Sequence, residues 1–141
     1  MSIGELLTHT IARSGRPDTL LRVEEDATVN GRKLALDRAF VNLMDNADKH
    51  GAGLIEITVR HVGAEVTVSI DDAGPGVPAD QRERIFERFA TAHTRGGRTA
   101  GTGLGLALVA QTVAAHGGHV ACTDRPEGGA RFLVTLPAES V

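Results

Sequence analysis

The chain has 141 residues, a formal net charge of −3 and 41% hydrophobic residues, which suits one domain with a single core. The negative charge and the absence of Trp and Tyr argue against a nucleic-acid surface, which needs basic patches and stacking aromatic rings. The single cysteine, Cys122, cannot form an internal disulfide, and no apolar run is long enough to cross a membrane. We therefore expect a soluble domain in which Cys122 is a buried strand residue.

The first half of the chain predicts two helices with extended structure between them. Ile3 to Arg13 has apolar residues at helical spacing, and a glycine and a proline follow it. Leu20 to Val29 alternates loosely, as in a strand or a strand pair. Leu34 to His50 is strongly amphipathic, and the glycines that follow can end a helix.

The second half predicts a hairpin, two helices and a final strand pair. Leu54 to Val62 and Glu65 to Ile70 alternate with a period of two residues, which predicts a hairpin with one buried face. Ala79 to Phe89 predicts a short helix and Gly103 to His116 a longer one. The last strands are expected at 120–123 and 131–136. This order predicts a two-layer α+β sandwich, with a mixed, mostly antiparallel sheet covered on one face by helices.

A polar stripe interrupts the helix predicted at 34–50. Asn42, Asn46 and Lys49 share one side of that helix, and His50 follows Asn46 by one turn. Because an unpaired buried amide costs about 1–3 kcal/mol, the stripe faces either solvent or a polar ligand. An Asn oxygen can bind Mg²⁺, and Lys can contact a phosphate. The glycine motifs further along the chain favour the ligand over a solvated face.

The first glycine motif, Asp72-Ala-Gly-Pro-Gly76, follows the second strand of the hairpin. Gly74 and Gly76 permit a tight turn or the close approach of a flat ligand. The Asp72 carboxylate can accept a hydrogen bond from the exocyclic amine of adenine, where guanine has a carbonyl. The alternative is a tight strand-to-helix turn without a ligand. Asp71 should face the opposite side of the strand, in a structural or solvent-facing role.

The second glycine motif, Gly101-Thr-Gly-Leu-Gly-Leu106, opens the helix predicted at 103–116. Free N–H groups and the helix dipole at such a terminus can bind phosphate. Leu106 excludes a dinucleotide-binding fingerprint, and the absence of any Gly-Lys pair excludes a P-loop. A glycine-rich helix start without a ligand is the alternative. The polar loop at 90–100 carries Arg95 and Arg98, and each of them either reaches a terminal phosphate or faces solvent.

In this order the motifs resemble the catalytic ATP-binding domain of bacterial two-component sensor histidine kinases, a branch of the Bergerat-fold superfamily. The resemblance spans about residues 20–137, with an N box at 42–50, a G1 box at 72–78, an F box at 85–89 and a G2 box at 101–106. It implies the Bergerat fold for 1–141 as one domain, with an ATP lid at 90–100 and either a first helix or a linker at 1–19. One departure is Arg32, because the family usually has Asp after the glycine at 31.

The resemblance also implies a role for each matching position. Asn42, Asn46 and Lys49 would be the catalytic residues, of which the two asparagines hold Mg²⁺ and the lysine touches a phosphate. Asp72 would bind the adenine amine. The other residues expected to contact ATP are His50, Gly74 and Gly76 near the adenine, and Arg95, Arg98, Gly101, Thr102, Gly103, Leu104 and Gly105 near the phosphates.

The implied activity is transfer of the γ-phosphoryl group from Mg-ATP to a histidine. Hydrolytic relatives carry Glu at the position of Asn42, and an amide cannot act as the general base that activates water, so ATP hydrolysis should be slow. None of the six histidines has the surroundings of a phosphoacceptor box, which places the acceptor on a separate dimerisation and phosphotransfer domain. A response regulator would receive the group next.

We expect this chain to be a monomeric cytoplasmic domain of a kinase anchored in the inner membrane, without a nucleic-acid partner. Two alternatives stay open. One is a stand-alone serine kinase of the anti-sigma-factor type from the same superfamily. The other is a regulatory module that binds a nucleotide without catalysis.

Overall fold

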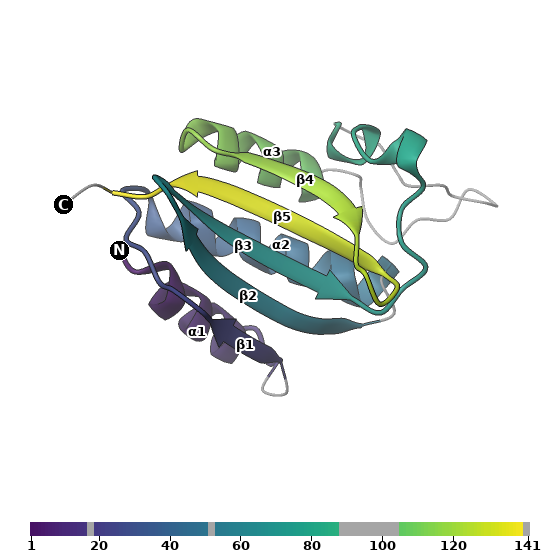
Figure 1. Ribbon diagram of the computed structural model, residues 1–141, viewed down its shortest axis with the longest axis horizontal. Helices are drawn as coiled ribbons and strands as arrows, with labels where there is room; N and C mark the ends of the chain where they lie inside the picture. Colours follow the sequence, from purple (N-terminus) through teal and green to yellow (C-terminus); the bar gives the residue numbers. More distant parts are fainter. Residues whose placement is uncertain (17–18, 51–52, 88–104, 140–141) are drawn as a thin grey trace.

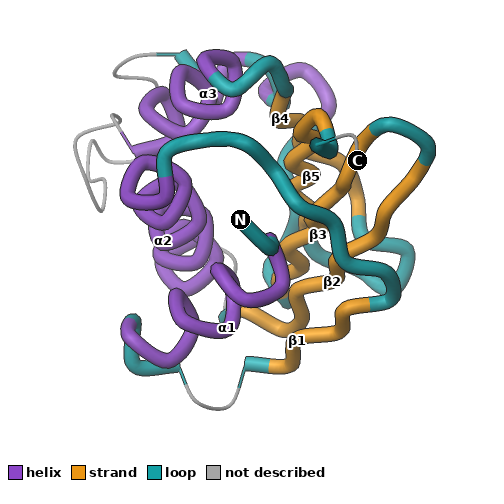
Figure 2. Tube along the Cα trace, turned by 90° about the vertical axis from the view of Figure 1, so that its left-hand side faces the viewer, coloured by secondary structure: helices purple, strands orange, loops and turns teal. Residues whose placement is uncertain are grey.

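The computed structural model describes the chain apart from residues 17–18, 51–52, 88–104 and 140–141. It has two layers, a twisted sheet and a set of helices packed on one of its faces (Figures 1 and 2). The two-layer α+β architecture expected from the sequence is confirmed. Within the described ranges, no helix is long and apolar enough to cross a membrane.

The helical layer is formed by α1 (Ile3–Arg13), α2 (Lys33–His50) and α3 (Gly105–Ala115). The helices pack on the sheet through one apolar face each, as the helical spacing of their apolar residues predicts. The buried apolar residues of this layer are Ile3, Leu6, Leu7, Ile11, Leu36, Ala39, Phe40, Leu43, Met44, Ala47, Ala107, Val109 and Val113.

Polar contacts also join α1 to α2. The Asp37 carboxylate accepts hydrogen bonds from the Thr10 hydroxyl (2.6 Å) and from the Arg13 guanidinium. Three residues beyond the end of α1, Arg16 forms ion pairs with Asp45 (2.6 Å) and Asp48 (2.7 Å) of α2. These contacts hold α1 against α2 at a fixed position along its length.

The sheet contains β1 (Leu20–Val23), β2 (Leu54–Val62), β3 (Glu65–Asp72), β4 (His119–Asp124) and β5 (Ala130–Pro137). Their spatial order is β1-β2-β3-β5-β4, with β1 parallel to β2 and the other neighbours antiparallel. Val59, Val68 and Val134 lie opposite one another on three adjacent strands and are fully buried. This row forms the middle of the core, under the helices.

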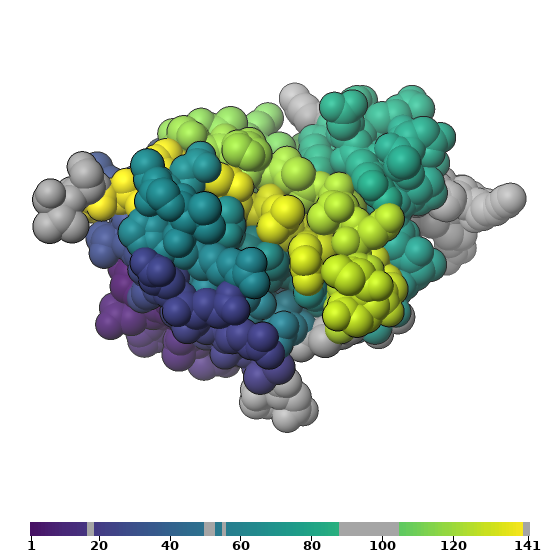
Figure 3. Space-filling model, in the orientation of Figure 1, coloured from purple at the N-terminus to yellow at the C-terminus, as the bar shows by residue number. Residues whose placement is uncertain are grey.

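By sequence, the other face of the sheet carries mainly polar side chains. Strands β2 to β5 lie at the molecular surface in Figure 3. Asp71 lies on this side and accepts two hydrogen bonds from the Arg131 guanidinium, at 2.8 and 3.0 Å. The structural role expected of Asp71 is therefore an ion pair between neighbouring strands. On β4, Cys122 is buried as expected, and burial raises the pKa of its thiol to about 11.

The segment at 79–89 differs from the prediction. Instead of one α-helix, its described part, residues 79–87, forms two short 3₁₀ turns, η1 (Ala79–Gln81) and η2 (Arg84–Phe86). Within these turns only Ile85 is buried, so no continuous apolar face supports several turns of α-helix. Phe86 packs edge-on against Phe132, with ring centroids 6.0 Å apart. Phe89, expected beside it as a second anchor, lies outside the described residues.

Candidate functional site

Asp72, the last residue of β3, has a buried carboxylate held by two backbone groups. Its Oδ1 accepts from the N–H of Gly74 (2.9 Å) and from the N–H of Ala130 on β5 (3.1 Å). The first bond is local and the second crosses to a neighbouring strand, so together they fix the plane of the carboxylate. Across the described residues, no donor is bonded to Oδ2. This oxygen therefore has acceptor capacity left for a ligand.

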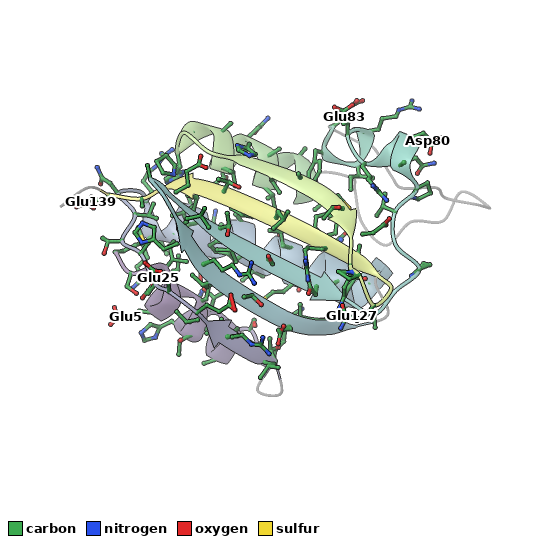
Figure 4. The ribbon with its side chains drawn as sticks, in the orientation of Figure 1. Glu5, Glu25, Asp80, Glu83, Glu127 and Glu139 are labelled. Carbon is green, nitrogen blue, oxygen red and sulfur yellow. The ribbon has the colours of Figure 1, made fainter. Side chains whose placement is uncertain are left out.

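The β4–β5 turn approaches Asp72 so closely that only glycine fits. A Cβ atom on Gly129 would lie 2.1 Å from the Asp72 carbonyl oxygen, and the Gly129 φ of +102° itself favours glycine. In Figure 4 the label of Glu127 marks this turn, beside the end of β3. In the sequence, Gly128 and Gly129 lie between the two strands predicted at 120–123 and 131–136, but nothing there indicates that they position a carboxylate.

The loop after Asp72 is tied to the same β4–β5 hairpin. Gly76 has a φ of +85°, which agrees with the unusual turn expected there, whereas the contribution of Gly74 is the N–H that bonds Asp72. Arg82 donates from Nε to the Val77 carbonyl (3.0 Å) and pairs with Asp124 (2.7 Å). The sequence alone does not single out Arg82, because one arginine in a polar segment has no distinguishing pattern.

The polar stripe of α2 faces the start of α3. Asn42 is half-buried, and its Nδ2 lies 3.5 Å from the carbonyl oxygen of Gly105, the first residue of α3. Asn46 is half-buried one turn later, and Lys49 is exposed near the end of the helix. The structure thus brings the asparagine stripe and the second glycine motif together at Gly105.

Gly53 connects the asparagine helix to the loop after Asp72. Its N–H donates to the Ala47 carbonyl (3.0 Å) and its carbonyl accepts from the Ala73 N–H (3.1 Å). Ala47 follows Asn46 in the chain, and Ala73 follows Asp72. One residue therefore links the backbone beside each of the two predicted functional side chains.

Part of the predicted site falls outside the described residues. This applies to Arg95, Arg98, Gly101, Thr102, Gly103, Leu104 and the side chain of His50. In the remainder of the chain there is no cluster of three or more His, Cys, Asp or Glu side chains arranged for a metal ion. The donors that the described site offers to a hard cation are the amide oxygens of Asn42 and Asn46.

Comparison with known proteins identifies the family. The sequence model of the histidine kinase-, DNA gyrase B- and HSP90-like ATPases matches residues 31–140. The chain belongs to this ATPase family. Within the family its relatives are sensor histidine kinases, so this is an ATP-binding domain of the histidine kinase type. The relatives do not favour the serine kinase or the module without catalysis.

Two relatives from Mycobacterium tuberculosis illustrate the similarity. The sensor histidine kinase component HK1 is 39% identical over 140 residues, which cover 97% of this chain and 82% of HK1. The sensor-type histidine kinase PrrB is 43% identical over 111 residues, which cover 78% of this chain and 24% of PrrB. The match thus spans most of HK1 and about a quarter of PrrB.

Solved structures agree with the sequence comparisons. The ATP-binding domain of PrrB from M. tuberculosis superposes with a TM-score of 0.78 and 33% identity, covering 99% of this chain and 96% of that one. The mycobacterial sensor histidine kinase MprB gives a TM-score of 0.81 and 29% identity, covering 100% and 97%. The fold of this chain is thus that of histidine kinase catalytic domains.

Proposed function

We propose that this domain binds Mg-ATP between the end of β3 and the facing ends of α2 and α3. Asp72 binds the adenine, and Asn42, Asn46 and Lys49 act on the phosphates, which lie at the start of α3. The γ-phosphoryl group then passes to a histidine on a separate dimerisation domain and from there to a response regulator. The observation that carries this proposal is the fixed Asp72 carboxylate, with Oδ1 bonded twice and Oδ2 available.

The state of this carboxylate explains how the site would select adenine. Two backbone N–H groups use Oδ1, so the ligand meets Oδ2, which can only accept a hydrogen bond while the carboxylate is ionised. Adenine presents a donor amine to that acceptor. Guanine presents a carbonyl oxygen at the same ring position, and this oxygen would be repelled by Oδ2 of Asp72. Selection by one buried, hydrogen-bonded group discriminates strongly, because the wrong base leaves that group unpaired.

The asparagine stripe fits a magnesium ion. Asn42 points its Nδ2 at the Gly105 carbonyl, which leaves the amide oxygen as a free ligand atom, and Asn46 adds a second amide on the same side of α2. When bound, Mg²⁺ would neutralise charge on the phosphate oxygens and so favour phosphoryl transfer. Lys49, exposed near the end of α2, provides a point charge for a phosphate.

The amide at position 42 also suits a kinase better than a hydrolase. An amide cannot remove a proton from water, so bound ATP is kept for the acceptor. A neutral imidazole nitrogen of the acceptor has its own lone pair for the attack. The bond between the γ-phosphorus and its bridging oxygen breaks, a nitrogen–phosphorus bond forms, and ADP leaves. Because ATP and response regulators occur in the cytoplasm, we place this domain there, as a monomeric part of a membrane-anchored kinase.

Calorimetric titration with Mg-ATP and Mg-GTP tests the proposal. The informative variant is Asp72→Asn. The two backbone donors require its amide oxygen in the place of Oδ1, so the NH₂ group takes the place of Oδ2 and meets the adenine amine donor to donor. We expect selective ATP binding by the wild type and a loss of about tenfold or more in the variant.

Asp80→Asn is the matched control. It removes the same charge from an exposed position on η1, away from β3 (Figure 4). We expect this variant to bind ATP like the wild type. Equal binding of ATP and GTP by the wild type, or an equal effect of the two substitutions, would contradict the proposal.

A further inference from the structure

The C-terminal end of α3 is fixed to the sheet. Gly117 donates its N–H to Ala114 (2.9 Å) and Gly118 donates to Val113 (3.0 Å), and Gly117 has a φ of +81°. This pair of bonds forms a Schellman cap, which gives the capped residue, His116, a defined backbone position. A Cβ atom on Gly118 would lie 1.9 Å from the Thr135 carbonyl oxygen, so the cap sits directly against β5.

The His116 ring connects this cap to the start of α2. Nδ1 lies 2.7 Å from the Thr112 carbonyl oxygen, and Nε2 lies 3.0 Å from the backbone nitrogen of Arg32. A carbonyl only accepts and a backbone amide only donates, so the proton is on Nδ1 and the lone pair on Nε2. The ring therefore accepts from α2 and donates within α3 at the same time.

The contact with His116 supplies a hydrogen-bond acceptor for the N-cap N–H of α2, which α2 lacks in its own sequence. Arg32 precedes the first residue of α2, and its carbonyl accepts from Leu36 (3.0 Å), so it occupies the N-cap position. A capping box would place Glu or Gln at the third helical position to accept the N-cap N–H, but that residue is Ala35. His116 supplies this acceptor from another helix.

The contact is also tightly packed. A Cβ atom on Gly31 would lie 2.3 Å from Cδ2 of His116, so any side chain at that position would displace the ring. The φ of Gly31 does not lie in the left-handed region, so its backbone would accept alanine. Gly31 is therefore required by the imidazole rather than by the turn.

The position of this contact relates it to the proposed site. Helices α2 and α3 pack against each other in opposite directions, with Arg32 beside His116 at one end of α3 and Asn42, in the middle of α2, beside Gly105 at the other. Helix α3 has 11 residues, so the two contacts are separated by about 16 Å of rigid helix. A shift of α3 along its axis at His116 would therefore move Gly105 relative to Asn42.

We propose that His116 is a positioning residue for the phosphate half of the nucleotide site. It does not touch the nucleotide, but it sets how far the start of α3 extends past the asparagines of α2. This inference rests on the proposed function. It predicts that a change at His116 affects binding of the phosphates while binding of the adenosine half, which depends on Asp72, stays the same.

Two conservative variants separate this role from a general effect on folding. In His116→Gln the amide oxygen can reach the place of Nε2 and accept from Arg32. In His116→Asn the shorter amide can reach only the place of Nδ1 and keeps the bond to Thr112. NMR titrations with Mg-ATP and with adenosine measure each variant, and thermal unfolding shows that each is folded.

We expect His116→Gln to bind both ligands within about twofold of the wild type, and His116→Asn to lose about fivefold in Mg-ATP affinity with adenosine affinity unchanged. Wild-type ATP affinity in His116→Asn, or equal losses for the two ligands, would overturn the positioning role alone. A wild-type chain that binds neither ligand would overturn the proposed function and this inference with it.

A double-mutant cycle gives an independent test. Gly31→Ala should lower Mg-ATP affinity in the wild type, because the new methyl group displaces the imidazole. In a His116→Ala background the ring atoms that it meets are gone, so the same substitution should have little further effect. Additive losses in the double variant would contradict the proposed contact.

Discussion

The backbone N–H of Ala130 donates to the carboxylate of Asp72 at 3.1 Å, although 58 positions separate the two residues in the chain. Through this bond, the first residue of β5 holds the side chain of the last residue of β3 in place. It also leaves one oxygen of the carboxylate for a ligand. The geometry of the proposed adenine contact therefore depends on the β4–β5 turn as well as on Asp72.

Gly129→Ala tests this dependence. The added methyl group would collide with the Asp72 carbonyl, so we expect a lower unfolding free energy and a loss of about tenfold in ATP affinity, equal to a displaced charge-assisted hydrogen bond. Gly128→Ala is the control, because Gly128 has a similar φ of +101° and a methyl group added to it would meet no atom within 4 Å. Denaturant unfolding and calorimetry measure both. An equal loss of ATP affinity in the two variants would show that backbone strain, and not the contact with Asp72, is responsible.

The magnesium contact makes a second prediction. Asn46→Ala should bind ATP in the presence of EDTA as the wild type does, but it should lose the gain in affinity that Mg²⁺ gives the wild type. The reason is that the Asn46 amide oxygen would contact ATP only through the Mg²⁺ ion. Asn30→Ala, at an exposed position before α2, serves as the control and should keep the full gain. Titrations with and without EDTA measure the difference, and an unchanged response to Mg²⁺ in Asn46→Ala would argue against this ligand.

Asp37, on the side of α2 that contacts α1, predicts a dependence of stability on pH. Burial would raise the pKa of this carboxyl, but hydrogen bonds from Arg13 and Thr10 outweigh burial and hold its pKa below the ordinary value. A carboxyl with a lowered pKa in the folded state stabilises the fold above its unfolded pKa of about 4, and this contribution is lost as the pH falls through the folded pKa.

Asp37→Asn should therefore lower the melting temperature by several degrees at neutral pH and by less in acid. Thermal unfolding across the acid range measures both chains. Asp80→Asn, at an exposed carboxylate on η1, should show no such change. A constant difference between Asp37→Asn and the wild type at every pH would mean that packing, and not the charge, is what Asp37 contributes.

The sequence predicted the helices and strands whose apolar residues follow one continuous periodic pattern. The apolar spacing of α1, the long helix α2 and the alternation of the β2–β3 hairpin each reflect burial of a single face, so their limits agree with the structure to within about two residues. The α-helix predicted at 79–89 was wrong, because residues 79–87 have no continuous apolar face and Phe86 packs against the Phe132 ring. Residue type, together with the glycine motifs, was enough to select Asn42 and Asp72 as candidates.

The contacts that position those candidates could not be predicted from the sequence. The bond from Ala130 to Asp72, the link through Gly53 and the ring of His116 each join residues that are distant in the chain. Only the fold brings such partners together, and neither member carries a local signature of the pairing. For the same reason Arg82 and Gly129 became recognisable as parts of the site only in three dimensions.

The most direct test of the proposed adenine contact is a cycle between Asp72 and the exocyclic amine of adenine. Affinities of the wild type and of Asp72→Asn are measured for Mg-ATP and for the triphosphate of purine riboside, which lacks that amine. If Oδ2 accepts from the amine, its removal should weaken binding to the wild type by about tenfold and should not weaken binding to the variant. An equal loss in both proteins, or no loss in the wild type, would contradict the claim that Asp72 binds adenine.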